Sequence, residues 1–449
     1  MSVQKSGRPI IWFAVYQLLW HLLLPLAFIR LAWRARHSIQ YLGHLSERLG
    51  FGYTKPTIRD AIWIHAVSVG ETRAAQPLIE AYLARGEKIL LTHMTLNGRR
   101  TGKHLFASAI AAGQIRQVYL PYDLCGPVEH FLKTFKPKIG LFMETEAWPT
   151  IVFRCAEIGL PLFLVNARLS QRSAKRVQSF GKAGQALFQA FAGVLAQTAF
   201  DAERYQQLGV RNIEVVGNLK FDVPLDSTQL QKGHQWRAKL EAVKRPMVCA
   251  ASTRDGEEAI ILKAWQELLQ GNVLTPPPLL CLIPRHPERF ADVANLIANM
   301  GLTFRKRSEW LDTPDACNGV EVILGDSMGE MAMYYSAASL TVMGGTLLPF
   351  GGQNLIEACA AGCPVLLGQH TYNFQQAAID AIDCGAAKQM KDEALLSEPL
   401  ALVETLKSCL LNADQLEQMS KAAKQYALDH QGATQSIMTI LDRQTHLVN

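Results

Sequence analysis

The chain of 449 residues is too long for a single hydrophobic core, so we expect two domains. Its hydrophobic fraction of 49% and charged fraction of 19% are typical of globular proteins. The net charge of +6 comes entirely from the first 60 residues, because basic and acidic residues balance in the rest. A neutral body with a basic end does not fit a nucleic-acid-binding protein, so we expect no nucleic acid partner.

An apolar segment near the N-terminus, "PIIWFAVYQLLWHLLLPLAFI", lies between Arg8 and Arg30 and carries no formal charge. It is long enough to span a bilayer. Arginines after the segment outnumber the basic residues before it, which predicts that the body of the protein is cytoplasmic. We therefore expect residues 1–36 to form a basic membrane anchor. The alternative is a buried helix that packs on the main fold.

From residue 60 onward, short apolar runs alternate with helical patterns, which predicts parallel α/β layers. The strands predicted in the first half are 61–67, 88–92, 116–120, 138–144, 161–166, 194–197 and 213–216. After a polar stretch at 222–245, further strands are predicted at 246–251, 278–283, 320–324, 339–343 and 364–368.

This pattern predicts two Rossmann-like domains in tandem, facing a cleft. We place the N-terminal domain at 37–225 and the C-terminal domain at 226–449, whose last helix can cross back to the first domain. In such doubly wound sheets, ligands bind outside the carboxyl ends of the strands. The residues that follow each predicted strand are therefore the candidates for function.

In the first half, polar groups follow four predicted strands. They are Glu71, then Glu144 and Glu146, then Asn166, Arg168 and Ser170, and finally Lys220. Carboxylates and a lysine at one sheet edge are suited to moving a proton and stabilising an anion. Taken alone, Glu71 is more simply explained as a helix-start carboxylate, a role worth ~0.3–1 kcal/mol.

In the second half, the loops after the strands favour a ligand that carries phosphate. Ser252 and Thr253 precede a helix whose free amides would attract an anion, and Arg285 directly follows a strand. The stretch "GGTLLPFGGQNLIE" has paired glycines that allow close backbone approach, with Asn354 and Glu357 at a helix start. A carboxylate there can accept hydrogen bonds from the hydroxyls of a ribose.

Several site types are not indicated by the sequence. Nine cysteines are scattered without a C-x-x-C pair, which is typical of a reducing cytosol and predicts neither a disulfide framework nor a zinc site. Neither a dinucleotide-binding fingerprint nor a P-loop is present in the right context. We therefore expect no metal and no cofactor.

Taken together, the motifs resemble one family, the Kdo transferases of lipopolysaccharide biosynthesis. The resemblance runs in order to about residue 375 and rests on "HAVSVGET", "YLPYDL", "METEAWP", "NARLS", "GNLKFD", "IPRHPERF", "GDSMGEM" and "GGQNLIEACAAGCPVLLGQHTYNF". It implies the GT-B glycosyltransferase fold. It also implies an inverting, metal-independent transfer of 3-deoxy-D-manno-oct-2-ulosonic acid (Kdo) from CMP-Kdo to the lipid A precursor, lipid IVA, at the cytoplasmic side of the inner membrane, releasing CMP.

The resemblance also implies roles for individual residues. Glu71 corresponds to the general base, kept ionised by its helix start, while Glu144 and Lys220 correspond to residues that stabilise the transition state. The implied CMP-binding residues are Pro284, Arg285, Met328, Gly329, Glu330, Asn354, Leu355, Ile356 and Glu357. The last motif departs from the usual GGHNPLE, because Gln353 replaces the histidine and Leu355 the proline.

Two other functions remain open at the level of sequence. One is another GT-B sugar-nucleotide transferase or an epimerase, because a fold does not fix an activity. The other is a membrane-anchored lipid-binding protein that has lost activity. Release of CMP, and not UDP, would separate the first alternative from Kdo transfer, and turnover would exclude the second.

Overall fold

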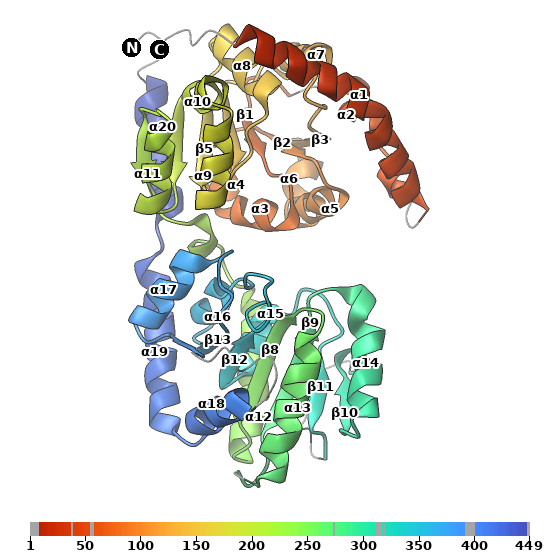
Figure 1. The fold of residues 1–449 in the computed structure, drawn as a ribbon, viewed down its shortest axis with the longest axis vertical. Coiled ribbons are helices and arrows are strands. Elements are labelled where there is room, and N and C mark those ends of the chain that lie inside the picture. Colours follow the sequence, from red (N-terminus) through yellow and green to blue (C-terminus); the bar gives the residue numbers. More distant parts are fainter. Residues whose placement is uncertain are drawn as a thin grey trace. The chain divides into compact units, whose positions relative to one another are not determined.

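The computed structural model describes residues 9–36, 39–53, 58–272, 274–310, 317, 319–390 and 400–446. Lys5 and Arg8, the basic residues that precede the apolar segment of the predicted anchor, lie outside the described residues. The chain forms two compact units (Figure 1): Met1–Val223 together with Gln431–Asn449, and Pro224–His430. Each unit is built on a seven-stranded sheet.

The sheet of the first unit is fully parallel and has the order β3-β2-β1-β4-β5-β6-β7. Because the chain first builds outward from β1 to β3 and then returns beside β1, the direction of winding reverses between β1 and β4. Such a switch point is where ligands bind in open α/β sheets. The strands are β1 (Ile62–His65), β2 (Ile89–His93), β3 (Ile115–Tyr119), β4 (Ile139–Met143), β5 (Leu162–Ala167), β6 (Gly193–Ala196) and β7 (Ile213–Val215).

Helices cover both faces of this sheet, because successive strand residues point to opposite sides. Trp63 packs with Phe131 and Phe142 on one face, whereas Ile64 belongs to a second apolar cluster on the other. The helices are α1 (Ile10–Ala35), η1 (Ile39–Leu42), α2 (Leu45–Arg48), α3 (Val69–Ala74), α4 (Gln76–Ala84), α5 (Leu96–Leu105), α6 (Ala107–Ala111), α7 (Cys125–Phe135), α8 (Pro149–Ile158), α9 (Gln171–Ser179), α10 (Lys182–Gln189), α11 (Ala199–Gln207) and η2 (Leu219–Phe221).

The C-terminal helix α20 (Ala433–His446) belongs to the first unit. Its buried side chains Ile437, Met438 and Leu441 complete the cluster that contains Ile64. An ion pair between Arg85 and Asp442 (2.8 Å) ties the same helix to the end of α4. The last helix of the chain therefore crosses back to the unit in which the chain begins.

The second unit also has a fully parallel sheet, in the order β10-β11-β9-β8-β12-β13-β14. Its strands are β8 (Met247–Thr253), β9 (Leu279–Pro284), β10 (Phe304–Lys306), β11 (Val322–Leu324), β12 (Leu340–Met343), β13 (Val365–Leu367) and β14 (Ala387–Gln389). Its helices are α12 (Ser227–Ala242), α13 (Glu257–Gln270), η3 (Pro287–Arg289), α14 (Phe290–Asn299), η4 (Arg307–Glu309), α15 (Met331–Ala337), α16 (Ile356–Ala360), α17 (Gln375–Asp383), α18 (Leu400–Leu410) and α19 (Ala413–Asp429).

All twelve strands predicted from apolar runs are confirmed, with ends shifted by a few residues. Strands β10 and β14 were not predicted. Each has three residues ("FRK" and "AKQ") and lies at an outer edge of its sheet, so it lacks the apolar run that marks a strand buried on both faces. Most of the polar stretch predicted as a junction forms helix α12, which buries Trp236 against the second unit.

The helix α1 is the one helix among the described residues that is long and apolar enough to cross a membrane. It lies along the first unit, which it contacts through one face: Phe13 packs on Phe153, and Trp20 packs on Tyr122 and Trp148. The other face is exposed and apolar. Its exposed large side chains are Ile11, Val15, Leu18, Leu19, Leu22, Leu23, Leu26, Ile29 and Trp33. The alternative of a helix that packs on the main fold is therefore right about the packing of one face but wrong about burial, because most of α1 is exposed.

Candidate active site

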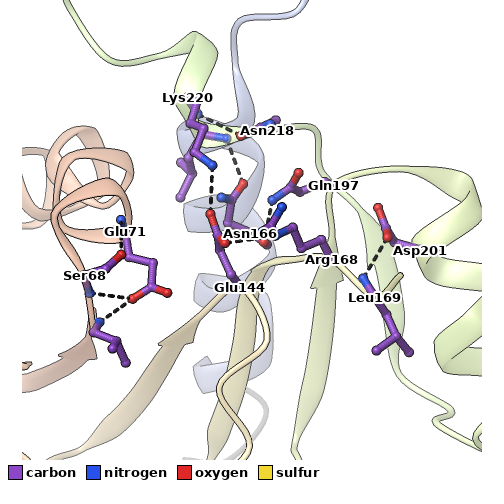
Figure 2. A network of polar contacts seen from close by, with 12 residues as sticks. Ser68, Glu71, Glu144, Asn166, Arg168, Leu169, Gln197, Asp201, Asn218 and Lys220 are labelled. Carbon is purple, nitrogen blue, oxygen red and sulfur yellow. Dashed lines mark hydrogen bonds and ion pairs between the residues drawn. The ribbon is translucent and has the colours of Figure 1, made fainter. Parts of the chain in front are cut away.

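Glu71 lies directly beyond the end of β1, in the first turn of α3. The Ser68 side chain caps this helix by accepting a hydrogen bond from the Glu71 amide (3.4 Å). In return, the Glu71 carboxylate accepts hydrogen bonds from the Ser68 amide (2.9 Å) and the Val67 amide. This reciprocal capping box fixes the carboxylate at the edge of the sheet, as Figure 2 shows.

Burial raises the pKa of Glu71 to about 7, and repulsion from Glu144 and Glu146 adds to the effect. The two backbone hydrogen bonds act in the opposite direction but do not cancel it. The expectation that the helix start keeps this side chain fully ionised is therefore wrong. At neutral pH the group is divided between its two protonation states, which is the condition under which a carboxylate can both take up and release a proton.

Glu144 follows β4, the strand next to β1, and is buried. Its carboxylate forms two ion pairs, with the Lys220 ammonium group (2.9 Å) and the Arg168 guanidinium group (3.0 Å). Lys220 comes from the short helix η2 that follows β7, and Arg168 follows β5. Figure 2 shows how these three side chains meet beside Glu71. Four predicted residues are thus brought together at the edge of one sheet.

The pKa values of the Glu71 and Glu144 carboxylates are shifted in opposite directions. Burial alone would raise the pKa of Glu144, but Lys220 and Arg168 outweigh it and hold that pKa below its ordinary value. The surroundings of Glu144 therefore favour its ionised form, whereas those of Glu71 disfavour it. Titratable groups whose surroundings separate their pKa values in this way are a mark of acid–base sites.

The remaining predicted residues of the first half make contacts with neighbouring groups of the protein. Glu146 accepts a hydrogen bond from the indole of Trp148 (2.9 Å), and burial raises its pKa. Ser170 caps helix α9 by accepting from the Ser173 amide (3.2 Å). Asn166 is buried, and its side chain holds the Leu219 amide (3.0 Å) next to Lys220.

In the second unit, the predicted loops follow four neighbouring strands, β11, β9, β8 and β12, and therefore lie along one sheet edge. Pro284 is the last residue of β9, and the Arg285 amide donates to the Thr253 carbonyl at the end of β8 (3.0 Å). Burial above all, and next the charge of Glu357, raise the pKa of Tyr335, whereas Arg285 lowers it. The charges of Arg285 and Glu357 therefore both influence the ionisation of the buried Tyr335 hydroxyl.

The loop after β11 contains Met328, Gly329 and Glu330. Met328 is 68% exposed, and Gly329 has a φ of +83°, a conformation that favours glycine. The Glu330 carboxylate pairs with Arg307 (2.7 Å) and accepts a hydrogen bond from Ser327. The Glu330 carboxylate is thus engaged within the protein, while Met328 and Gly329 are exposed.

The loop after β12 ends in a capped helix. The Asn354 side chain accepts a hydrogen bond from the Ile356 amide (3.2 Å) and donates one to the Glu357 carboxylate (3.0 Å). Leu355 and Ile356 are buried. Leu355, which replaces the usual proline, therefore fills the core before α16 without losing the turn.

One functional candidate was missed from the sequence. The fully buried Glu257 carboxylate accepts hydrogen bonds from the backbone amides of Arg254 (2.8 Å), Gly345 (2.7 Å), Leu347 (3.0 Å) and Leu348 (3.3 Å). It thereby fixes the glycine loop after β12 to the start of α13. Only the doubled glutamate after "STRDG" could have indicated it. Glu257 is the first residue of α13, but its carboxylate binds amides of the β12 loop and of Arg254, so an anion at the free amides of this helix start stays a prediction.

Within the part of the chain that the structure describes, no group of three or more His, Cys, Asp or Glu side chains is arranged to hold a metal ion. The predicted residues include two cationic groups in the first unit, Lys220 and Arg168, and one in the second unit, Arg285. Metal independence stays a prediction of the resemblance.

Comparison with known proteins gives the family. The family model for 3-deoxy-D-manno-octulosonic-acid transferase (kdotransferase) matches residues 43–223. The 3-deoxy-D-manno-octulosonic acid transferase of Bordetella pertussis is 44% identical over 85% of this chain and 86% of the relative. The transferase of Haemophilus influenzae is 32% identical over 90% of this chain and 92% of the relative. The chain belongs to the Kdo transferase family.

Solved structures support the fold of this Kdo transferase. The UDP-GlcNAc 2-epimerase of Neisseria meningitidis matches 87% of this chain and its own full length with a TM-score of 0.57 at 15% identity. A glycosyltransferase of Rickettsia africae matches 87% of this chain and 99% of its own with a TM-score of 0.56 at 12% identity. At these identities the likeness concerns the fold alone, two parallel α/β units of the GT-B type.

Proposed function

We propose that this Kdo transferase moves Kdo from CMP-Kdo to a hydroxyl of the lipid A precursor, lipid IVA, and releases CMP. The proposal rests mainly on one observation: at the switch point of the first unit, a carboxylate with a pKa of about 7 lies beside an ionised carboxylate held by two cations. This arrangement provides a base and positive charge at one sheet edge.

In the proposed reaction, Glu71 takes the proton of the acceptor hydroxyl as its oxygen forms a bond to the anomeric carbon of Kdo. The bond from that carbon to the phosphate oxygen of CMP breaks, and its electron pair leaves with the phosphate. Because attack and departure occur on opposite faces, the anomeric centre inverts. A base with a pKa near the working pH is best suited to this proton transfer.

Lys220 and Arg168 supply two positive charges against the single negative charge of Glu144, so this cluster keeps a net positive charge. We infer that Glu144 orients the Lys220 ammonium group, which then stabilises negative charge that develops or arrives at the site. The anionic groups in question are the phosphate of the donor, the carboxylate of Kdo and the phosphates of the acceptor.

The second unit is proposed to bind CMP. Arg285 would contact the phosphate, and Glu357 would accept hydrogen bonds from the ribose hydroxyls. The loop at Met328, Gly329 and Glu330 offers backbone groups for the base. Asn354 supports Glu357 directly (3.0 Å), and Glu257 supports the neighbouring glycine loop. Pro284, Leu355 and Ile356 complete the proposed donor site as backbone and packing residues.

We further propose that α1 attaches the enzyme to the cytoplasmic side of the inner membrane by lying in the membrane surface. Its inner face is tied to the first unit by polar contacts: Tyr16 donates to Asp123 (2.8 Å), and Gln17 donates to Thr150 (2.6 Å). Its apolar outer face is free to enter the acyl region, as in interfacial helices. The C-terminal arginines Arg30 and Arg34 would contact lipid phosphates.

The direct test is incubation of the full-length protein with CMP-Kdo and tetraacyl lipid A precursor, followed by mass spectrometry of the lipid. We expect a mass gain of one or more Kdo units together with release of CMP. The same reaction with a UDP-sugar should give neither product. An unchanged lipid, in parallel with a working positive control enzyme, would contradict the proposal and favour another nucleotide sugar or a binding role.

A further inference from the structure

Asn166 is a buried residue next to the Lys220 turn that the reaction scheme above does not use. It follows the core of β5 and is fully buried, and its backbone has a φ of +51°. This left-handed conformation is unfavourable for most residues and is tolerated best by glycine and asparagine. A strained backbone at the end of a sheet strand, beside the ion-paired Glu144, is a position that calls for a specific explanation.

The side chain of Asn166 makes one decisive contact. Its amide oxygen accepts a hydrogen bond from the backbone amide of Leu219 (3.0 Å), the residue before Lys220. Asn218 caps the same turn from the other side, accepting from the Lys220 amide (3.0 Å). The backbone carbonyl of Asn166 in turn accepts from the Gln197 side chain (2.9 Å), which anchors Asn166 to the end of the next strand.

The other end of the Asn166 carboxamide has a different environment. Because the backbone amide of Leu219 is a hydrogen-bond donor, the side-chain oxygen of Asn166 must face it. This fixes the direction of the side-chain nitrogen of Asn166. That nitrogen is buried and has no hydrogen-bond partner among the residues that the structure describes. Figure 2 shows the side chain of Asn166 between the Glu144 carboxylate and the η2 turn. Leaving a buried donor without a partner is unfavourable, so its retention next to the Glu144 loop points to a functional reason.

We propose that Asn166 is a positioning residue for the transfer reaction, which holds the turn that bears Lys220 so that the ammonium group stays on Glu144. The inference rests on the roles proposed above for Glu144 and Lys220. Without the Asn166 side chain, the Leu219 amide loses its acceptor and the η2 turn can move away from β5. Asparagine suits the position because its second group is a neutral donor, whereas aspartate would place a second negative charge beside Glu144.

A double-mutant cycle tests this proposal. Asn166→Gly removes the side chain, and glycine tolerates the positive φ. Lys220→Met removes the positive charge with a side chain of similar length. We expect Asn166→Gly to lower kcat by about 10- to 100-fold with little change in KM for CMP-Kdo, since small displacements of positioned groups have effects of this size. In the Lys220→Met background, Asn166→Gly should change kcat by less than about threefold, because the group that it positions is gone.

The outcomes distinguish the role proposed for Lys220 from the role proposed for Asn166. If Lys220→Met keeps the kcat of the unchanged protein, the role proposed for Lys220 fails. If Lys220→Met is impaired while Asn166→Gly is fully active, or if their effects multiply, the positioning role of Asn166 is wrong.

Two further variants exclude a general loss of structure. Asn212→Ala removes a comparable contact elsewhere in the first unit, the hydrogen bond from Asn212 to the Ala192 carbonyl (2.8 Å), and should leave kcat unchanged. Asn166→Asp keeps an acceptor for Leu219 but adds charge near Glu144. Its pH–rate profile should therefore shift its acid limb to higher pH, and a profile that superimposes on the unchanged protein's would contradict the proposed geometry.

Discussion

At the scale of single residues, two glutamates that follow the neighbouring strands β1 and β4 differ because of what surrounds them. Glu144 is held by Lys220 and Arg168, which lowers its pKa in spite of burial. Within the described residues Glu71 has backbone amides as its partners but no cation, so burial and the two nearby carboxylates raise its pKa to about 7. The same residue type thus supplies a fixed anion and a titrating base at one sheet edge.

The pH dependence of activity follows from this difference. If Glu71 must be ionised to act as the base, kcat/KM should fall by about tenfold per pH unit below pH 7 and level off above it. Glu146→Gln removes one of the charges that raise the pKa of Glu71, so the midpoint of the acid limb should move to lower pH. It should stay above the ordinary glutamate range, since burial is the largest cause and remains.

The control for this experiment is Glu80→Gln, which removes an exposed carboxylate on α4. Its pH–rate profile should match that of the unchanged protein. A midpoint that rises in Glu146→Gln, or a profile without an acid limb near neutrality, would show that Glu71 is not the titrating base.

At the scale of elements, Asp123 joins α1 to α8. Its buried carboxylate accepts hydrogen bonds from the Thr150 amide (2.8 Å), the Ile151 amide (3.0 Å) and the Tyr16 hydroxyl (2.8 Å). It therefore caps the helix that follows the Glu144 loop and holds the amphipathic helix α1 against it. Burial raises the pKa of Asp123 to about 6, and the hydrogen bonds only partly oppose this effect.

Replacing this carboxylate should loosen both helices. We expect Asp123→Ala to lower the free energy of unfolding of the first unit by about 2–4 kcal/mol, because it leaves several buried donors without an acceptor. In detergent, trypsin should also cleave after Arg30 and Arg34 faster than in the unchanged protein. Glu157→Ala, an exposed change on α8, is the control. Unchanged cleavage rates would contradict the role of Asp123 in holding α1.

Which elements could be predicted depended on how local their signal is. Buried parallel strands are marked by apolar runs, so β1 and β9 could be predicted from the sequence. The short edge strands β10 and β14 lack such runs and could not. The position of Glu71 at a helix start was also local. The raised pKa of Glu71 could not be predicted from local sequence, because it depends on burial and on Glu144 and Glu146, which are some seventy residues away in the chain. The same holds for Glu257, whose four partners lie mainly in a loop about ninety residues later.

At the scale of the whole molecule, the chain begins and ends in the same unit. Helix α20 contributes buried side chains to the core around Ile64, so the C-terminus is part of the unit that carries Glu71 and Glu144. The second unit is thus a continuous segment inserted between parts of the first. Stability of the proposed acid–base site therefore depends on residues that directly follow the second unit in the sequence.

This dependence can be measured. Ile437 is fully buried, and Ile437→Ala should lower the free energy of unfolding of the first unit by about 2–5 kcal/mol through lost burial and the cavity left behind. Urea unfolding followed by the tryptophans of each unit would report it. Ser436→Ala, an exposed change on the same helix, should have little effect. Equal small effects of both changes would show that α20 is not part of this core.

The central claim is that Glu71 is the base of a Kdo transfer whose donor is bound by the second unit. Its most direct test compares Glu71→Gln with the unchanged protein in turnover of CMP-Kdo with lipid A precursor, with CMP affinity measured by calorimetry on the same samples. We expect turnover to fall by about 10²- to 10⁴-fold, the range for loss of a general base, while CMP affinity stays the same. Turnover near that of the unchanged protein, with CMP still bound, would contradict the claim.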